Sequence, residues 1–205
     1  MDSKRSVAEP SLPRSRPGKS RAALLQAGLT LFAERPVDAV PIDEIVTVAG
    51  VAKGTFFNHF ADKHAFAGAI ASEIRLEIED LVATTNRDVT DPMDRLANGM
   101  RVAGNFALSN RQRTQMLLRM GDGMPSENHP LNRGVSADIS AAVRSGQARP
   151  EAELQGVPYW LSLCQGLMVQ LTAGDMKPDN AVSRIEAMVA MGLSGISSQH
   201  GGQGS

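Results

Sequence analysis

The segment "AGVAKGTFFNHF", residues 49–60, decides how this chain is organised. Small residues surround Gly50 in its first half, whereas its second half holds three of the six phenylalanines of the chain within five residues. Because glycine tolerates the left-handed backbone in which many helices end, Gly50 predicts a tight turn between two short helices. The apolar spacing places these helices at residues 42–48 and 53–59.

Helical periodicity extends over nearly all of the remaining chain. Residues 20–34 carry a stripe of apolar side chains, with Ser20 available as the cap and Pro36 as the breaker. Six further helices follow, and Asp62 caps the first of them; they span residues 62–85, 93–108, 111–121, 128–146, 151–173 and 178–194. Strand-like alternation and internal repeats are absent from the sequence. The sequence therefore predicts an all-α protein of about nine helices.

Composition argues against secretion and membrane insertion. A single cysteine, Cys164, excludes an internal disulfide framework and fits a reducing compartment. No apolar run reaches the ~18 residues that a membrane span needs, and the N-terminus has no signal-peptide core. We therefore expect a cytoplasmic protein. The first 21 residues hold six basic and two acidic side chains, so residues 1–18 are expected to form a disordered basic arm, and residues 196–205 a disordered tail.

The two short helices have the arrangement of a helix-turn-helix. In such units the second helix enters the DNA major groove by its N-terminal end. Here Lys53 can reach guanine or phosphate, Thr55 can donate a hydrogen bond, and Gly54 lets the backbone approach the groove. Phe56 and Phe60 are expected to pack beneath the helix. The alternative is an ordinary corner of a helical bundle, in which the glycines and aromatic rings only build a core.

At these residues the sequence resembles the TetR (tetracycline-repressor-like) family of bacterial transcription regulators. The similarity spans about residues 20–71 and includes "LFAE", "AGVAKGT" and "FFNHF". The resemblance implies an N-terminal three-helix DNA-binding domain over residues 19–66. It implies DNA contacts by the following residues: Lys53, Gly54, Thr55, Phe57, Asn58, His59 and Lys63.

Three residues depart from the family pattern. Pro36 stands where glycine is usual, Pro41 replaces a capping serine or threonine, and Phe57 replaces a frequent tyrosine. The last two changes remove hydroxyl groups that can bind phosphate, which weakens affinity without changing sequence preference. We hypothesise that the basic arm compensates electrostatically. The alternative is that the arm is only a solubilising tail.

The resemblance also implies a larger helical ligand-binding and dimerisation domain over residues 67–195. Residues 157–171 are apolar around most of the helix, more than one buried face requires. The homodimer is expected to form through the last two helices, at about 151–173 and 178–194; the alternative is that both are intrachain core. An unidentified small-molecule effector is expected, with these candidate contacts: Phe106, Met116, Met120, Trp160, Cys164 and Met168.

The sequence leaves the chemistry of the effector open. Apolar residues at helical spacing are also typical of plain core, and Cys164 is expected to be a buried structural thiol rather than a redox sensor. No charged cluster defines the ligand, so an apolar or aromatic molecule is the default. The acidic stretch of residues 73–80 is interpreted as a solvated helix face.

The sequence predicts no enzyme. Common catalytic and phosphate-binding motifs are absent, and the four histidines are scattered without metal-ligand spacing, so no metal and no cofactor are expected. The expected function is a ligand-responsive transcriptional regulator, a repressor that binds a palindromic operator as a homodimer and is released by its effector. The alternative is a helical interaction module that no longer binds DNA specifically.

Overall fold

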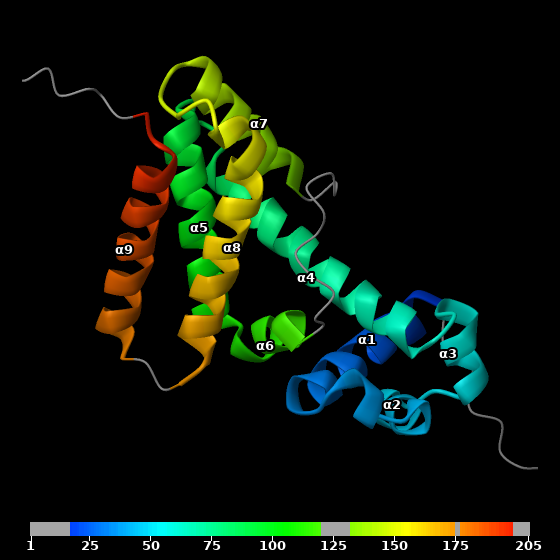
Figure 1. Ribbon diagram of the computed structural model, residues 1–205. Helices are drawn as coiled ribbons and strands as arrows, with labels where there is room; N and C mark the ends of the chain where they lie inside the picture. The colour runs from blue at the N-terminus through cyan, green and yellow to red at the C-terminus, as the bar shows by residue number, and fades with distance from the viewer. Residues whose placement is uncertain (1–16, 120–131, 175–176, 199–205) are drawn as a thin grey trace, which may run out of the picture.

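The computed structural model describes residues 17–119, 132–174 and 177–198. These residues form nine α-helices and one short 3-10 helix, with no strand among them (Figure 1). The helices are α1 (Pro17–Glu34), η1 (Val37–Ala39), α2 (Ile42–Ala49), α3 (Lys53–His59), α4 (Lys63–Thr85), α5 (Pro92–Ser109), α6 (Arg111–Arg119), α7 (Arg133–Arg144), α8 (Ala152–Thr172) and α9 (Pro178–Ile196). The all-α prediction is confirmed. Most of the expected arm and tail lies outside the described residues.

Several helix ends follow from local chemistry. Gly50 closes α2 in the left-handed conformation, at φ 65° and ψ 36°, as its position in the sequence predicts. Asp62 caps α4, because its carboxylate accepts a hydrogen bond of 2.7 Å from the Ala65 amide. The expectation for Ser20 was wrong. Helix α1 already begins at Pro17, and Ser20 is a buried residue inside it.

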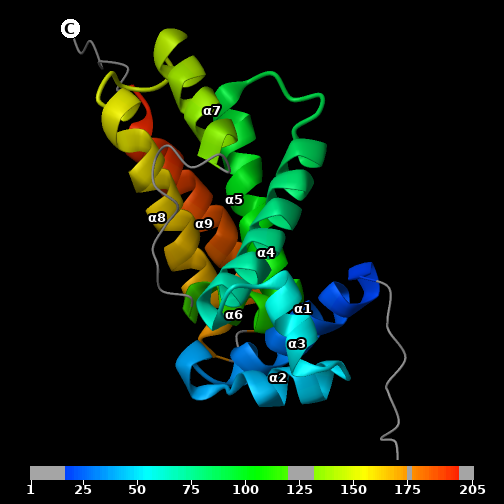
Figure 2. The same cartoon turned by 90° about the vertical axis from the view of Figure 1, so that its right-hand side faces the viewer.

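The helices enclose two hydrophobic cores. The first lies among α1, α2, α3 and the beginning of α4, and the second lies among α5, α7, α8 and α9. Helix α4 runs from one core to the other, and Figures 1 and 2 show the three N-terminal helices gathered at one end of it. Ile78 of α4 packs against both cores, as does Leu117 of α6. No described helix combines the length and apolarity that crossing a membrane requires.

Helix α6 belongs to the junction between the two cores. Phe106 of α5 and Met116 of α6 are both buried in the first core, beside α1, and not in the second. The glycine at position 28 of α1 permits a similarly close packing, because a Cβ atom there would lie 2.4 Å from the ring of Phe66. Helices α4 and α6 are therefore both packed directly against α1.

Candidate functional site

Helix α3 is fixed to the protein by its aromatic side chains. Phe56 and Phe60 are buried, and both rings pack against Phe66 of α4, with centroids 5.2 Å and 4.8 Å apart. The prediction that these two phenylalanines are core is confirmed. Because the ring contacts anchor one side of a helix of only two turns, its opposite side is presented at a fixed angle.

The opposite side of α3 is open. Lys53, Gly54, Phe57 and Asn58 are exposed, and half of the Phe57 side chain, 50%, is accessible to solvent. A Cβ atom built at Gly54 meets no atom within 4 Å, and the backbone there is not in the left-handed region. Nothing in the described part of the chain therefore requires glycine at this position. The absence of a side chain at Gly54 leaves room for a binding partner to approach the backbone of α3.

Lys53 lies at the first position of α3 and is paired within the domain. Its Nζ atom is 2.8 Å from Oδ1 of Asp43 on α2, and both side chains are more than half exposed. An ion pair this accessible is weak and is screened by salt. The ammonium group can thus leave Asp43 for a stronger anion at little cost.

Two other predicted contact residues have partners inside the protein. The Nε2 atom of His59 is hydrogen-bonded to Oγ of Ser20, at 3.0 Å. The Lys63 ammonium donates to the backbone carbonyls of Asp38 and Val40, at 2.9 Å and 3.1 Å, and so ties the loop after η1 to α4. As DNA contacts both residues stay predictions. Their roles in holding the domain together were not visible in the sequence, because the partners lie 23 to 39 positions away.

A large cleft opens between α4 and the helices of the second core. Its volume is about 1040 Å³, at the upper end of the range for small-molecule pockets. Apolar side chains from α4, α5, α6, α7 and α8 line much of it, among them Ile78, Val82, Leu96, Trp160 and Met168. The cleft also reaches the N-terminal helices, where Pro36 and His64 line it.

The cleft contains half of the residues that the sequence suggested as ligand contacts. Trp160, Cys164 and Met168 line it. Phe106 and Met116 do not, since both are buried in the first core, and Met120 lies outside the described residues. Burial raises the pKa of the Cys164 thiol to about 12, and nearby Glu79 adds to the shift. The thiol is therefore protonated at neutral pH.

The cleft wall also carries charges that the sequence did not reveal. The expectation that no charged groups define the site was wrong: Arg75, Glu79, Arg95 and Asp138 all line it. Arg95 pairs with Asp138 at 2.6 Å. Glu79 is half-buried rather than on a solvated face, and burial, followed by neighbouring Asp80, raises the pKa of its carboxyl group. The packing of α4 against α5 and α7 turns this side chain inward, and the sequence pattern alone does not show that packing.

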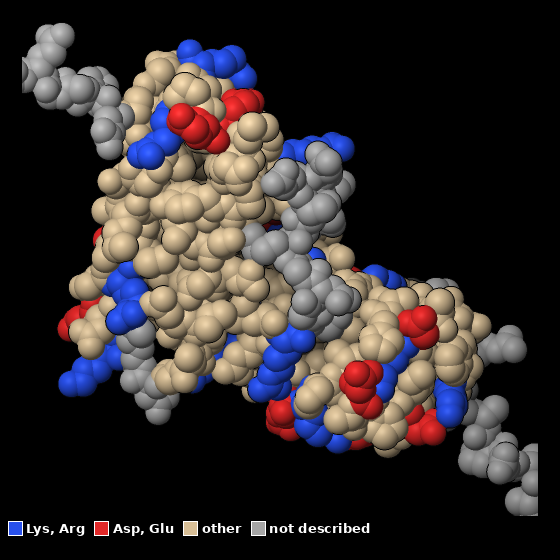
Figure 3. All heavy atoms as spheres, in the orientation of Figure 1, with Lys and Arg blue, Asp and Glu red and all other residues tan. Residues whose placement is uncertain are grey.

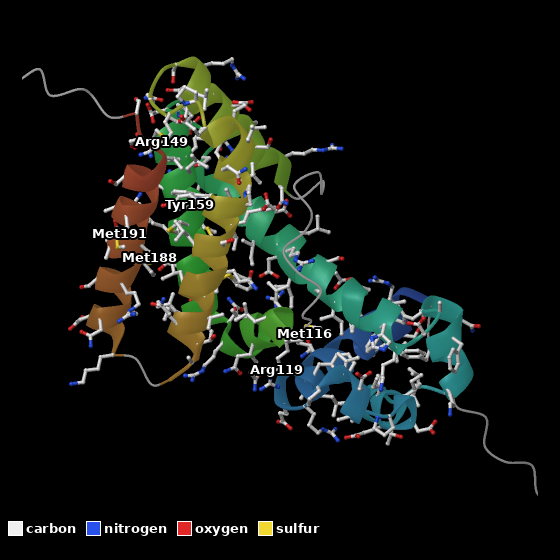
Figure 4. The ribbon with its side chains drawn as sticks, viewed as in Figure 1. Met116, Arg119, Arg149, Tyr159, Met188 and Met191 are labelled. Atoms are coloured by element: carbon white, nitrogen blue, oxygen red, sulfur yellow. The ribbon has the colours of Figure 1, made fainter. Side chains whose placement is uncertain are left out.

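Arg119 joins the cleft to the end of α1. Its guanidinium lines the cleft and donates to the backbone carbonyls of Phe32 and Ala33 in the last turn of α1. These carbonyls have no partner within their own helix, and a cation at a helix C-terminus is favourable. Figure 4 shows Arg119 and Met116 where α6 meets α1.

Helices α8 and α9 present a largely uncharged outer face. In Figure 3 most of the surface over these two helices is free of acidic and basic atoms, with charged atoms towards its lower end, whereas both kinds are interspersed over α1–α3. Large apolar side chains are exposed on α8 and α9: Leu154 at 77%, Val169 at 45%, Val182 at 59% and Met191 at 67%. Figure 4 shows Tyr159, Met188 and Met191 where the two helices lie side by side. Such a patch is typical of an interface.

Comparison with known proteins agrees with this architecture. Residues 24–70 match the model of the bacterial regulatory proteins of the tetR family. The HTH-type transcriptional repressor DhaR of Mycobacterium sp. (strain GP1) is 33% identical over 79 residues, which are 38% of this chain and 40% of DhaR. The chain thus matches less than half of that relative's length.

Solved structures extend the likeness to both cores. A tetR family transcription regulator from Shewanella sp. PV-4 superposes with a TM-score of 0.77 at 15% identity, over 88% of this chain and 99% of that one. AibR in complex with isovaleryl coenzyme A and operator DNA superposes with a TM-score of 0.63 at 19% identity, over 84% and 97%. The fold is that of a helix-turn-helix regulator with a helical C-terminal domain. Residues 24–70 thus resemble the bacterial regulatory proteins of the tetR family, and the described chain shares the fold of solved regulators of that family.

Proposed function

We propose that this protein is a cytoplasmic, ligand-responsive repressor that binds a palindromic operator as a homodimer. The observation that carries the proposal is the open N-terminal end of α3. Lys53, Gly54 and Thr55 stand there on a helix that an aromatic core holds in place, and the fold itself gives no reason for the glycine. A helix that enters the DNA major groove needs a rigid attachment to the protein on one side and small residues on the side that faces the groove.

The dimer places two such helices on one DNA duplex. A single helix-turn-helix reads too few base pairs, so a second copy at a spacing of about 34 Å doubles the site. The uncharged face of α8 and α9 supplies a self-complementary surface for a two-fold interface. Gly192 of α9 packs within its own chain, because a Cβ atom there would lie 2.9 Å from Trp160.

The effector acts through two connections between the cleft and the α3 helices of the dimer. One is α4, which lines the cleft and carries Phe66 beneath α3. The other is α6, whose Arg119 holds the last turn of α1. A ligand that changes the position of either helix changes the spacing of the two α3 helices. A coupling free energy of ~1–3 kcal/mol is enough to release the operator.

Operator selection tests the proposal. The purified protein is mixed with a pool of random duplex DNA, bound molecules are amplified, and the enriched sequences are footprinted. We expect a palindrome whose half-sites are about one helical turn apart. Failure to enrich any sequence would instead support the helical interaction module, in which Pro41 and Phe57 mark a lost DNA function.

The interface is tested by charge insertion. Met191→Arg introduces a cation into the uncharged face and is expected to give a monomer in analytical ultracentrifugation, with weaker operator binding. Leu76→Arg is the matched control, because Leu76 is also an exposed apolar residue, at 51%, but lies on α4. A dimer that survives Met191→Arg unchanged contradicts this interface.

A further inference from the structure

Arg75 is a charged group without a counterpart among the described residues that line the cleft. The side chain is half-buried and lines the cleft from the middle of α4. It makes no hydrogen bond and no ion pair with any residue in the described ranges. Burial lowers the pKa of its guanidinium, and no neighbouring carboxylate offsets this effect. Arginine nevertheless stays charged in proteins, so an uncompensated cation faces the cavity.

Apart from Glu79 and the exposed Glu34 at the end of α1, the other charged groups of the cleft have partners. Arg95 and Asp138 are paired at 2.6 Å, Arg119 binds carbonyls of α1, and Asp38 lies 3.3 Å from His64. The cleft therefore offers Arg75 no anion among these groups.

Glu79 lies one helical turn beyond Arg75 but does not neutralise it. Its carboxylate is directed towards α7, where a Cβ atom at Gly134 would lie 4.0 Å from Oε2. Burial also raises the pKa of the Glu79 carboxyl group.

The rest of the cleft wall suits the apolar part of a ligand. Ile78 and Val82 come from α4, Leu96 from α5, and Trp160 and Met168 from α8. A ligand without charge would fill this space and leave Arg75 desolvated and unpaired, which is costly. A carboxylate, by contrast, accepts two parallel hydrogen bonds from a guanidinium.

We propose that the cleft binds an amphipathic organic acid, whose carboxylate pairs with Arg75 and whose apolar body packs against Trp160. This inference rests on the proposed function in taking the cleft as the effector site. It specifies the chemical class of the effector by adding a carboxylate to the apolar or aromatic molecule that the sequence favoured.

The test compares two acids, decanoate and phenylbutanoate, with their primary amides, which serve as uncharged controls of the same shape. Trp160 is the single tryptophan of the chain and lines the cleft, so its fluorescence reports binding without any label. The full chain is titrated in the absence of DNA, and Tm is measured in parallel. We expect the acids to bind at least about tenfold more tightly than their amides, because a charge-assisted hydrogen bond is stronger than a neutral one.

Two variants assign the preference to Arg75. Arg75→Gln is expected to remove the difference between acid and amide, and Arg75→Lys to keep part of it, since lysine retains the charge but not the planar fork. Arg87→Gln is the control, because Arg87 is exposed just beyond α4 and does not line the cleft. Without ligand, Arg75→Gln should not lower Tm, since it removes an unpaired buried charge.

Three outcomes overturn the inference: equal affinity for acids and amides, an acid preference that survives Arg75→Gln, or no binding of either acid at millimolar concentration. The readout needs no DNA, so a failure of operator selection refutes the proposed function and leaves this result standing. Conversely, an acid that binds through Arg75 without releasing the operator supports the ligand class and contradicts its role as effector.

Discussion

The imidazole of His59 is hydrogen-bonded through Nε2 to the hydroxyl of Ser20, 3.0 Å away and 39 residues earlier in the chain. Ser20 is buried in the second turn of α1, whereas His59 is the last residue of α3. The bond therefore fixes the end of α3 against α1 and sets the orientation of a ring that is half exposed. A histidine held in this way can offer only its other nitrogen to DNA.

Ser20→Ala should weaken operator binding through His59. Loss of the hydroxyl leaves the ring free to turn, and we expect an affinity about fivefold lower, equivalent to ~1 kcal/mol. The measurement is a double-mutant cycle with His59→Ala, read by fluorescence anisotropy on the selected operator. The cycle should show a coupling of about 1 kcal/mol. Strictly additive effects would mean that the bond does not orient a DNA contact.

Gly54→Ala should separate stability from function. A Cβ atom there meets nothing within 4 Å, and alanine favours helix over glycine by up to about 1 kcal/mol, so Tm should rise. The same methyl group stands between α3 and the groove, and operator affinity should fall by about tenfold or more. Gly68→Ala on α4 is the control, since its added Cβ also meets open space. Unchanged operator binding by Gly54→Ala would argue against insertion of this end of α3.

Asp43 and Lys53 should have opposite effects on the operator. Lys53→Ala is expected to cost ~1–3 kcal/mol of binding free energy if the ammonium reads a base edge. Asp43→Asn releases Lys53 and removes an exposed negative charge near the phosphates, so affinity should increase, most clearly at low salt. Anisotropy titrations over a range of salt concentrations decide the matter. A loss with Asp43→Asn as large as that with Lys53→Ala would show that Asp43 positions the lysine in the complex.

Arg119→Gln should loosen the end of α1. The change removes the cation that binds the carbonyls of Phe32 and Ala33, and we expect a loss of about 0.5–1 kcal/mol in the free energy of unfolding. Hydrogen exchange should accelerate in the last turn of α1 and in α6 more than in α9. Arg144→Gln, at the exposed end of α7, serves as the control. Uniform acceleration over all helices would indicate a global loss of stability without a local connection.

Cys164 should be unreactive in the folded protein and should destabilise it at high pH. Its pKa of about 12, against an ordinary value of 9.0, means that the folded state holds the proton more tightly than the unfolded state. The stabilising contribution of the neutral thiol is therefore complete below about pH 9 and is lost as the pH rises towards 12. At pH 8 iodoacetamide should alkylate the native chain at least about a hundredfold more slowly than the chain in urea. Equal rates would place the thiol outside the apolar environment.

Local signals in the sequence predicted the helices well, because caps and breakers act within a few residues. Gly50 and Asp62 have the expected roles at the ends of α2 and α4. The failure at Ser20 has a simple cause: Pro17 already provides a favourable first helical position, so a hydroxyl three residues later is inside the helix. The short 3-10 helix after α1 was also not predicted, since a single turn has no periodicity.

The candidate sites were less predictable. Helical periodicity shows which face of a helix is buried, but it does not show which other element packs against that face. Phe106 and Met116 were correctly seen as apolar-face residues, but they are buried in the first core and do not line the cleft. Glu79 looked like a solvated charge for the same reason. The open face of α3 was easier to predict, since a family resemblance and a small residue at position 54 both pointed to it.

The half-exposed ring of Phe57 adds an apolar side chain to the polar ones on the open side of α3. A benzyl group cannot hydrogen-bond to a phosphate or to a base edge. Among the groups that the major groove displays, the C5-methyl of thymine is the one that an apolar side chain can recognise. If Phe57 faces the duplex as predicted, it loses only the phosphate-binding hydroxyl of tyrosine, and its ring can still contact a thymine methyl group. Operators of this protein should accordingly discriminate thymine from uracil at one position in each half-site.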